Sequence, residues 1–101
     1  MKASEYTLFL SDEAEADLTG IYNYIAYFLF NVPAADALLN SFDSAFDNTE
    51  LFPESHPFDK FEKGYRTIVV DNYIAFYKIE DNNLIQVYRI LYAKMAYENK
   101  L

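Results

Sequence analysis

The chain has only two arginines, and both fall in segments predicted to be strands. Each arginine alternates with aliphatic residues, namely Ile68 and Val70 for Arg66, and Val87 and Leu91 for Arg89. An arginine in such a pattern lies at the rim of a sheet face or is paired there, because an unpaired buried charge is very costly. If the sheet brings the two guanidinium groups together, they form an anion-binding site. The alternative for each is a structural salt bridge to one of the many acidic residues.

Other residues could act in proton transfer at such a site. Tyr92 follows Arg89 by three residues, and a phenol can donate a proton or a hydrogen bond to a leaving oxygen. Because the chain has ten tyrosines, packing is the alternative for Tyr92. His56 is the only histidine, which excludes a site built on several imidazoles; we expect it to be exposed in a loop, and nothing in the sequence places it beside the arginines. With no cysteine, thiolate catalysis and cysteine-ligated metals are excluded.

The charge is distributed unevenly along the chain, whose net charge is −8. Residues 1–59 contain one basic residue and eleven acidic ones, whereas residues 60–101 contain seven basic and five acidic residues. An acidic chain repels phosphate backbones at long range. Any binding of anions is therefore assigned to the C-terminal half, although acids on solvated helices also explain the asymmetry.

The first half of the sequence predicts a short strand followed by two helices. The strand is predicted at Tyr6–Leu10, Ser11 is a suitable N-cap for the first helix, and Pro33 suits the first turn of the second. The predicted apolar stripe of the first helix is Ala14, Leu18, Ile21, Tyr22, Ile25, Phe28, Leu29 and Val32, and that of the second is Ala35, Leu38, Leu39, Phe42, Ala45, Phe46 and Thr49. The short link between the helices predicts an antiparallel hairpin.

The second half predicts a loop and a three-stranded antiparallel meander. Residues 54–64 have no consistent period, and the strands are predicted at 65–70, 73–79 and 84–91. Asp71-Asn72 and Asp81-Asn82-Asn83 are turn residues at hairpin spacing. We therefore expect one α+β domain over residues 1–101, with the meander covering the helical hairpin. Met1–Glu5 lacks the apolar run of a signal peptide, and Ile21–Val32 is too short to span a bilayer, so we expect a soluble cytoplasmic protein without a membrane partner.

Several segments together resemble a known toxin superfamily. They are SDEAEADLTGIYNYI, the helix stop LFPESHP, GYRTIVVDNYIAFYKI and VYRILYAKMAY. In this combination and order they resemble the RelE/ParE superfamily, the toxins of bacterial type II toxin–antitoxin modules, also known as plasmid stabilization proteins. The resemblance implies a β-α-α-β-β-β fold with a helical hairpin packed on a mainly antiparallel twisted sheet. It also implies a cognate antitoxin as partner.

The resemblance implies two branches of activity. RelE- and YoeB-like members are mRNA interferases that cut messenger RNA in the ribosomal A site, and ParE-like members poison DNA gyrase. In the first branch, Arg66 corresponds to an arginine on the scissile phosphate, Tyr92 to an essential tyrosine, and Lys60 and Lys63 to RNA-binding loop cations. That endoribonuclease chemistry is metal-free and implies no cofactor, and it requires cations around the developing phosphorane and a proton donor.

The chain departs from the RNA-cutting pattern at several positions. It is acidic, Leu91 stands where YoeB-like members have a histidine, and Met95 and Ala96 stand where arginine or aspartate is common. We therefore predict an mRNA endonuclease toxin with Arg66, Arg89 and Tyr92 as catalytic residues. A gyrase inhibitor and a degenerate, non-toxic antitoxin-binding member are kept as alternatives. Aromatic residues of the first helix are predicted to pack in the core, with Tyr24, Tyr27 and Phe30 left as an exposed partner surface.

Overall fold

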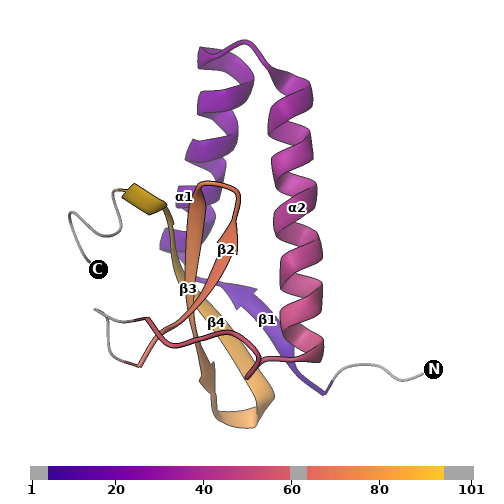
Figure 1. The fold of residues 1–101 in the computed structure, drawn as a ribbon, viewed down its shortest axis with the longest axis vertical. Coiled ribbons are helices and arrows are strands. Elements are labelled where there is room, and N and C mark those ends of the chain that lie inside the picture. Colours follow the sequence, from indigo (N-terminus) through magenta and orange to yellow (C-terminus); the bar gives the residue numbers. More distant parts are fainter. Residues whose placement is uncertain (1–4, 60–63, 95–101) are drawn as a thin grey trace.

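The computed structural model describes residues 5–59 and 64–94 and shows two helices on one face of a four-stranded sheet (Figure 1). The elements are β1 (Thr7–Leu10), α1 (Asp12–Asn23), a π-helical turn (Tyr24–Phe28), α2 (Val32–Leu51), β2 (Arg66–Val70), β3 (Tyr73–Glu80), a 3-10 turn (Asp81–Asn83) and β4 (Leu84–Tyr92). The strand order is β1-β4-β3-β2. β1 is parallel to β4, and the other pairs are antiparallel. The predicted α+β class and β-α-α-β-β-β order are confirmed.

Side-chain caps start both helices. The Ser11 hydroxyl accepts a hydrogen bond from the Ala14 amide at 3.0 Å, and three acids follow in the first turn of α1, where they favour the positive end of the helix dipole. The Asn31 side chain accepts from the Ala34 amide at 3.1 Å, and Pro33 lies in the first turn of α2, as predicted. In the described residues, no helix combines the length and the apolar character needed to cross a membrane.

The core lies between α2 and the helix-facing side of the sheet. The buried residues of α2 are Ala35, Leu38, Phe42, Phe46 and Thr49, all members of the predicted stripe. Tyr77 in β3 has no exposed surface, and its hydroxyl donates to the Pro53 carbonyl at 2.6 Å. This bond ties the end of α2 to the middle of the sheet. Burial raises the pKa of Tyr77 to about 12, against an opposing effect of the Arg66 charge.

The predicted stripe of the first helix is wrong at its C-terminal end. Phe28, Leu29 and Val32 were expected in the core, but 69%, 51% and 41% of their surfaces are exposed. The regular helix ends at Asn23, and a π-helical turn follows. A π-helical turn holds more residues than an α-helical turn, so it rotates the following side chains away from the face that they would occupy in a continuous helix.

A β-bulge in β4 changes which residues share a face. Phe76 pairs with Arg89, whereas Tyr77 pairs with Val87, so Tyr88 is the additional residue. The strict alternation predicted Arg89 on the same face as Val87, and this prediction is wrong because the bulge shifts the strand by one residue. Arg66 does share the helix-facing side with Ile68 and Val70, whose partners Ala75 and Tyr73 line the core.

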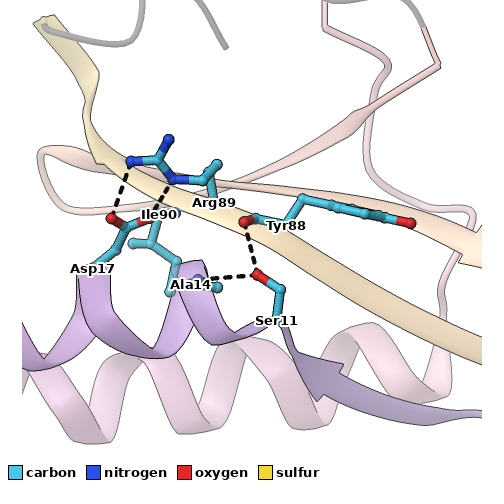
Figure 2. Close-up of polar contacts among 6 residues, drawn as sticks. All are labelled: Ser11, Ala14, Asp17, Tyr88, Arg89 and Ile90. Carbon is cyan, nitrogen blue, oxygen red and sulfur yellow. Dashed lines mark hydrogen bonds and ion pairs between the residues drawn. The ribbon is translucent and has the colours of Figure 1, made fainter.

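Helix α1 completes the edge of the sheet where β1 ends. Just after β1, the Ser11 amide donates to the Val87 carbonyl of β4 at 2.8 Å. Beyond it, the Ser11 hydroxyl donates to the Tyr88 carbonyl at 2.9 Å, and the Ile90 amide donates to the Asp17 carboxylate at 2.9 Å (Figure 2). Ala14 lies between these two side chains on the same helix face and is fully buried, which permits the close approach.

This edge contact predicts a specific stability effect at Asp17. We expect Asp17→Ala to lower the free energy of unfolding by about 1–3 kcal/mol, because it leaves the Ile90 amide without its acceptor. Asp43→Ala is the matched control, since Asp43 is an exposed acid on α2, and we expect a change within about 0.5 kcal/mol. Urea titrations of both variants measure the difference. Equal losses in the two variants would contradict the assignment.

The buried phenol of Tyr77 predicts destabilisation at alkaline pH. The folded chain retains this proton up to a pKa of about 12, whereas the unfolded chain releases it near 10.0. The unfolded state therefore binds fewer protons in this window, and the contribution of Tyr77 to stability is lost as pH rises from about 10 to about 12. We expect Tyr77→Phe to flatten this decline in chemical denaturation, while Tyr27→Phe, at an exposed position, leaves it unchanged.

Candidate functional site

Arg89 is held by a carboxylate of α1. Its Nε donates to Asp17 Oδ2 at 2.8 Å and its Nη2 to Asp17 Oδ1 at 3.1 Å, which is the two-point geometry of a strong guanidinium–carboxylate pair (Figure 2). These hydrogen bonds raise the pKa of Arg89 above its ordinary value, although burial acts in the opposite direction. The salt-bridge alternative is therefore realised at Arg89. A phosphate at these same donor atoms would have to displace Asp17.

Arg66 anchors the loop that follows α2. Its Nη1 donates to the His56 carbonyl at 2.7 Å and to the Glu54 carbonyl at 3.3 Å, and its guanidinium lies 4.1 Å from the centre of the Phe58 ring. The backbone supports this contact, because the Thr67 amide donates to the Pro57 carbonyl at 3.0 Å. Among the described residues, Arg66 is thus held by backbone carbonyls and an aromatic ring, whereas Arg89 is held by the Asp17 carboxylate.

His56 is half-buried, which differs from the predicted exposed loop histidine, and it lies beside Arg66, a contact that no sequence signal indicated. The Thr49 hydroxyl donates to the Ala45 carbonyl at 2.8 Å, so it accepts from His56 Nε2 at 3.2 Å. Burial, and then the charge of Arg66, lower the pKa of His56 below its ordinary value. The lowered pKa favours the neutral imidazole, which lies edge-on against the Tyr77 ring with 6.0 Å between the ring centres.

Tyr92 ends β4 and is 43% exposed. Its ring packs edge-on against that of Tyr73, its cross-strand partner, with 5.7 Å between the ring centres. Tyr92 thus packs against a neighbouring ring, as the packing alternative expects, and is also partly accessible to solvent. Other positions discussed from the sequence lie outside the described residues, namely Lys60, Lys63, Met95 and Ala96.

The sheet register separates the three predicted catalytic residues. Arg66 pairs with Tyr77 and Arg89 with Phe76, and consecutive residues of β3 point to opposite faces of the sheet. Tyr92 pairs with Tyr73, four residues from Tyr77, which corresponds to about 13 Å along the strand. The two guanidinium groups therefore do not converge on one anion in this structure. A catalytic role for the three residues stays a prediction.

Lys78 is a neighbour of Arg66 that the sequence analysis did not single out. Its Nζ lies 4.5 Å from the centre of the Tyr65 ring, and it shares a shallow cavity of about 370 Å³ with Arg66. No sequence signal indicated this, because Lys78 follows Tyr77, the strand partner of Arg66, and so lies on the other face of β3; only the cavity at the end of the sheet is lined by both cations. Among the described residues, no cluster of three or more His, Asp or Glu side chains could hold a metal ion. The cavity is lined by Glu54, Phe58, Gly64, Arg66, Lys78 and Ile79.

The fold is similar to that of toxins in solved toxin–antitoxin complexes. A chromosomal ParDE system from P. aeruginosa matches with a TM-score of 0.73 and 19% identity over 87% of this chain and 96% of that chain. The RelBE2 complex of Mycobacterium tuberculosis matches with a TM-score of 0.61 and 17% identity over 90% and 94% of the two chains. The RelB–RelE complex of Methanococcus jannaschii matches with a TM-score of 0.56 and 16% identity over 92% and 99%.

Sequence comparison distinguishes between these toxin families. No curated protein is significantly similar to the chain in sequence. The family model described as ParE toxin of the type II toxin–antitoxin system parDE matches residues 8–97, which include every described helix and all but the first residue of the described strands. The chain therefore belongs to the ParE toxin family of type II toxin–antitoxin systems.

Proposed function

We propose that this protein is a toxin that inhibits DNA gyrase in the bacterial cytoplasm and is neutralised by a cognate antitoxin. The observation that carries the proposal is the match of residues 8–97 to the ParE family, whose members were associated above with gyrase rather than with messenger RNA. The sequence analysis predicted an mRNA endonuclease and kept a gyrase inhibitor as an alternative. We now propose that alternative.

The arrangement of the cations supports this change. Cleavage of RNA without a metal ion requires several groups around one phosphate. Arg89 is held by Asp17, and the register places Arg66 and Arg89 on opposite faces of the sheet. A protein that acts by binding to another protein does not require this convergence.

The charge of the chain supports the same choice. A toxin that docks on ribosomal RNA gains affinity from many phosphate contacts, and a net charge of −8 opposes such contacts. A gyrase-directed toxin has a protein target, so the acidity penalises it less. The acidity instead favours target surfaces that are basic.

Cleavage of messenger RNA is the second candidate, and the cavity at Arg66 favours it. Arg66 and Lys78 place two cations beside aromatic rings in one hollow, which is an arrangement that can bind a phosphate and an adjacent base. In this candidate Arg66 contacts the phosphate and Tyr92 serves as proton donor. Lys60 and Lys63 would supply further RNA contacts.

Induced expression of the toxin without antitoxin separates the candidates. We expect growth arrest with covalent gyrase–DNA complexes and intact transcripts. Lys78→Gln provides the sharper comparison, because it removes a cation from the Arg66 cavity, and we expect its toxicity to stay within about twofold of the unmodified chain. Loss of toxicity in this variant together with cleaved transcripts in the unmodified chain would support the nuclease instead. Normal growth despite soluble protein would indicate the degenerate alternative.

The proposed antitoxin complex should depend on salt. Because residues 5–59 contain eleven acidic and no basic side chains, we expect the antitoxin to present cations to this half of the toxin. Raising the salt concentration from about 0.05 to about 0.5 M should weaken the complex by about tenfold or more, since it screens these charges. Calorimetric titrations at several salt concentrations measure the effect, and a salt-independent affinity would contradict the electrostatic contribution.

A further inference from the structure

The link between α1 and α2 carries a cluster of exposed apolar side chains that we name the hairpin tip. Six large apolar residues are between 41% and 90% exposed, and they lie within nine consecutive positions. Figure 1 shows that this link projects beyond the sheet, at one end of the molecule. A contiguous apolar cluster of this kind is typical of an interaction site rather than of ordinary surface. The hairpin tip consists of Tyr24, Tyr27, Phe28, Leu29, Phe30 and Val32.

The hairpin tip lies in the longest uncharged stretch of the chain. Residues 18–35 contain no acidic or basic side chain, although 24% of the whole chain is charged. The four acids of α1 lie between positions 12 and 17, at the end of that helix away from the hairpin tip. The first acid after the stretch, Asp36, accepts a hydrogen bond from the Tyr22 hydroxyl at 2.6 Å. A basic protein or a phosphate backbone therefore gains no ionic attraction from the hairpin tip, which suits a neutral, apolar partner surface.

Phe30 protrudes from the hairpin tip on a backbone that is fixed on both sides. It is 90% exposed and has a φ of 54°, which is unfavourable for a bulky side chain. Before it, the Leu29 amide donates to the Tyr24 carbonyl at 2.9 Å. After it, the Asn31 amide donates to the Ile25 carbonyl at 3.0 Å. A protruding ring on a fixed backbone loses less conformational freedom when it binds.

A cavity of about 360 Å³ lies beside Phe30, between α2 and the turn from β2 to β3. Leu29 and Asn31, the two chain neighbours of Phe30, line it, and the turn adds the exposed polar residues Asp71 and Asn72. A cavity of this size with mainly apolar walls can hold an aromatic side chain. Its aromatic and aliphatic lining residues are Tyr24, Ile25, Leu29, Ala34, Leu38 and Tyr73.

A protruding ring beside an apolar cavity makes this surface self-complementary. In a two-fold contact, residue i of one copy contacts residue j of the other and the reverse also holds. Because the neighbours of Phe30 line the cavity, the ring and the cavity lie side by side, and a single two-fold axis between them satisfies both contacts. A bilayer or an irregular protein surface has no such reciprocal match.

The exposed area sets the strength of such a contact. At roughly 200 Å² for an aromatic residue and less for leucine and valine, the exposed parts of the hairpin tip amount to about 700 Å² per copy. A standard interface buries about 800 Å² per partner, so the dimer is weak and depends on concentration. The net charge of −8 on each copy opposes association at long range, and salt screens this repulsion. The same charge opposes approach to an anionic bilayer.

We propose that the hairpin tip is a self-association site, through which two copies of this chain form a two-fold dimer with Phe30 of each copy in the cavity of the other. The inference goes beyond the proposed function and does not depend on the target of the toxin. The acids at positions 12–17 and 43–50 lie outside the hairpin tip, so the dimer leaves them available to the antitoxin.

Two substitutions test the ring and the cavity separately. Phe30→Asn removes the ring and places at positive φ a residue that tolerates this conformation well. Ala34→Leu narrows the cavity, and leucine is a good helix former at this half-buried position of α2. Val69→Thr is the control for an exposed apolar side chain outside the hairpin tip, since Val69 is 68% exposed on β2. Thermal melting confirms that all three variants are folded.

Sedimentation equilibrium of the purified chain, from about 1 to about 300 μM, measures the dimer directly. We expect a monomer–dimer equilibrium with a Kd on the order of 10 μM. Phe30→Asn and Ala34→Leu should each weaken it by about tenfold, as for central interface residues, and Val69→Thr should stay within about twofold. Raising the salt concentration from about 0.05 to about 0.5 M should strengthen the dimer by about threefold or more, which is the opposite of the effect expected for the antitoxin complex.

Several results would overturn the inference. They are a monomer at every concentration, a dimer that both test variants form as well as the control, and a dimer that salt weakens. Growth beyond two copies would contradict a closed two-fold contact. Binding to phosphatidylcholine vesicles that Phe30→Asn abolishes, by a chain that is monomeric in solution, would assign the hairpin tip to a bilayer. None of these measurements involves gyrase, so failure of the proposed function is distinguished from failure of this inference.

Discussion

The contact between α1 and the part of β4 beyond β1 is the constraint on which the rest of the fold depends. β1 pairs with β4 only as far as Val87. Without a further partner, the next backbone groups of β4 would lie against α1 with no hydrogen bond. Ser11 and Asp17 supply that partner through their side chains, and the buried Ala14 between them keeps helix and strand close. Ser11 also caps the start of α1, and the two side chains together complete the sheet edge and fix the hairpin relative to the sheet.

This constraint also determines what the two arginines do. Asp17 has oxygen atoms for both the Ile90 amide and the Arg89 guanidinium, so Arg89 is part of the α1–β4 junction. Arg66 has a similar structural task at the opposite edge, where it binds carbonyls of the loop after α2. Residue types that suggest phosphate chemistry here hold segments of the fold together.

The link between α1 and α2, residues 24–32, contrasts with the rest of the fold. α2 places its apolar stripe in the core with few exceptions, whereas the residues just before it expose rings to solvent around a π-helical turn and a left-handed phenylalanine. Exposed rings and a bulky residue with positive φ both cost stability.

Local rules were sufficient for much of this protein. Ser11 and Pro33 marked helix starts, Asp71-Asn72 marked a hairpin turn, and the stripe of α2 identified its buried face, because caps, turns and periodicity depend on residues near in sequence. The tertiary structure alone decided the bulge at Tyr88, the pairing of Asp17 with Arg89 over 72 positions and the meeting of His56 with Arg66. Asp17 is not part of the predicted apolar stripe of its helix, and only its position against the uncovered edge of β4 makes it an acceptor. Contacts of this kind depend on the strand register, and one additional residue in β4 changes the register without leaving any mark in local composition.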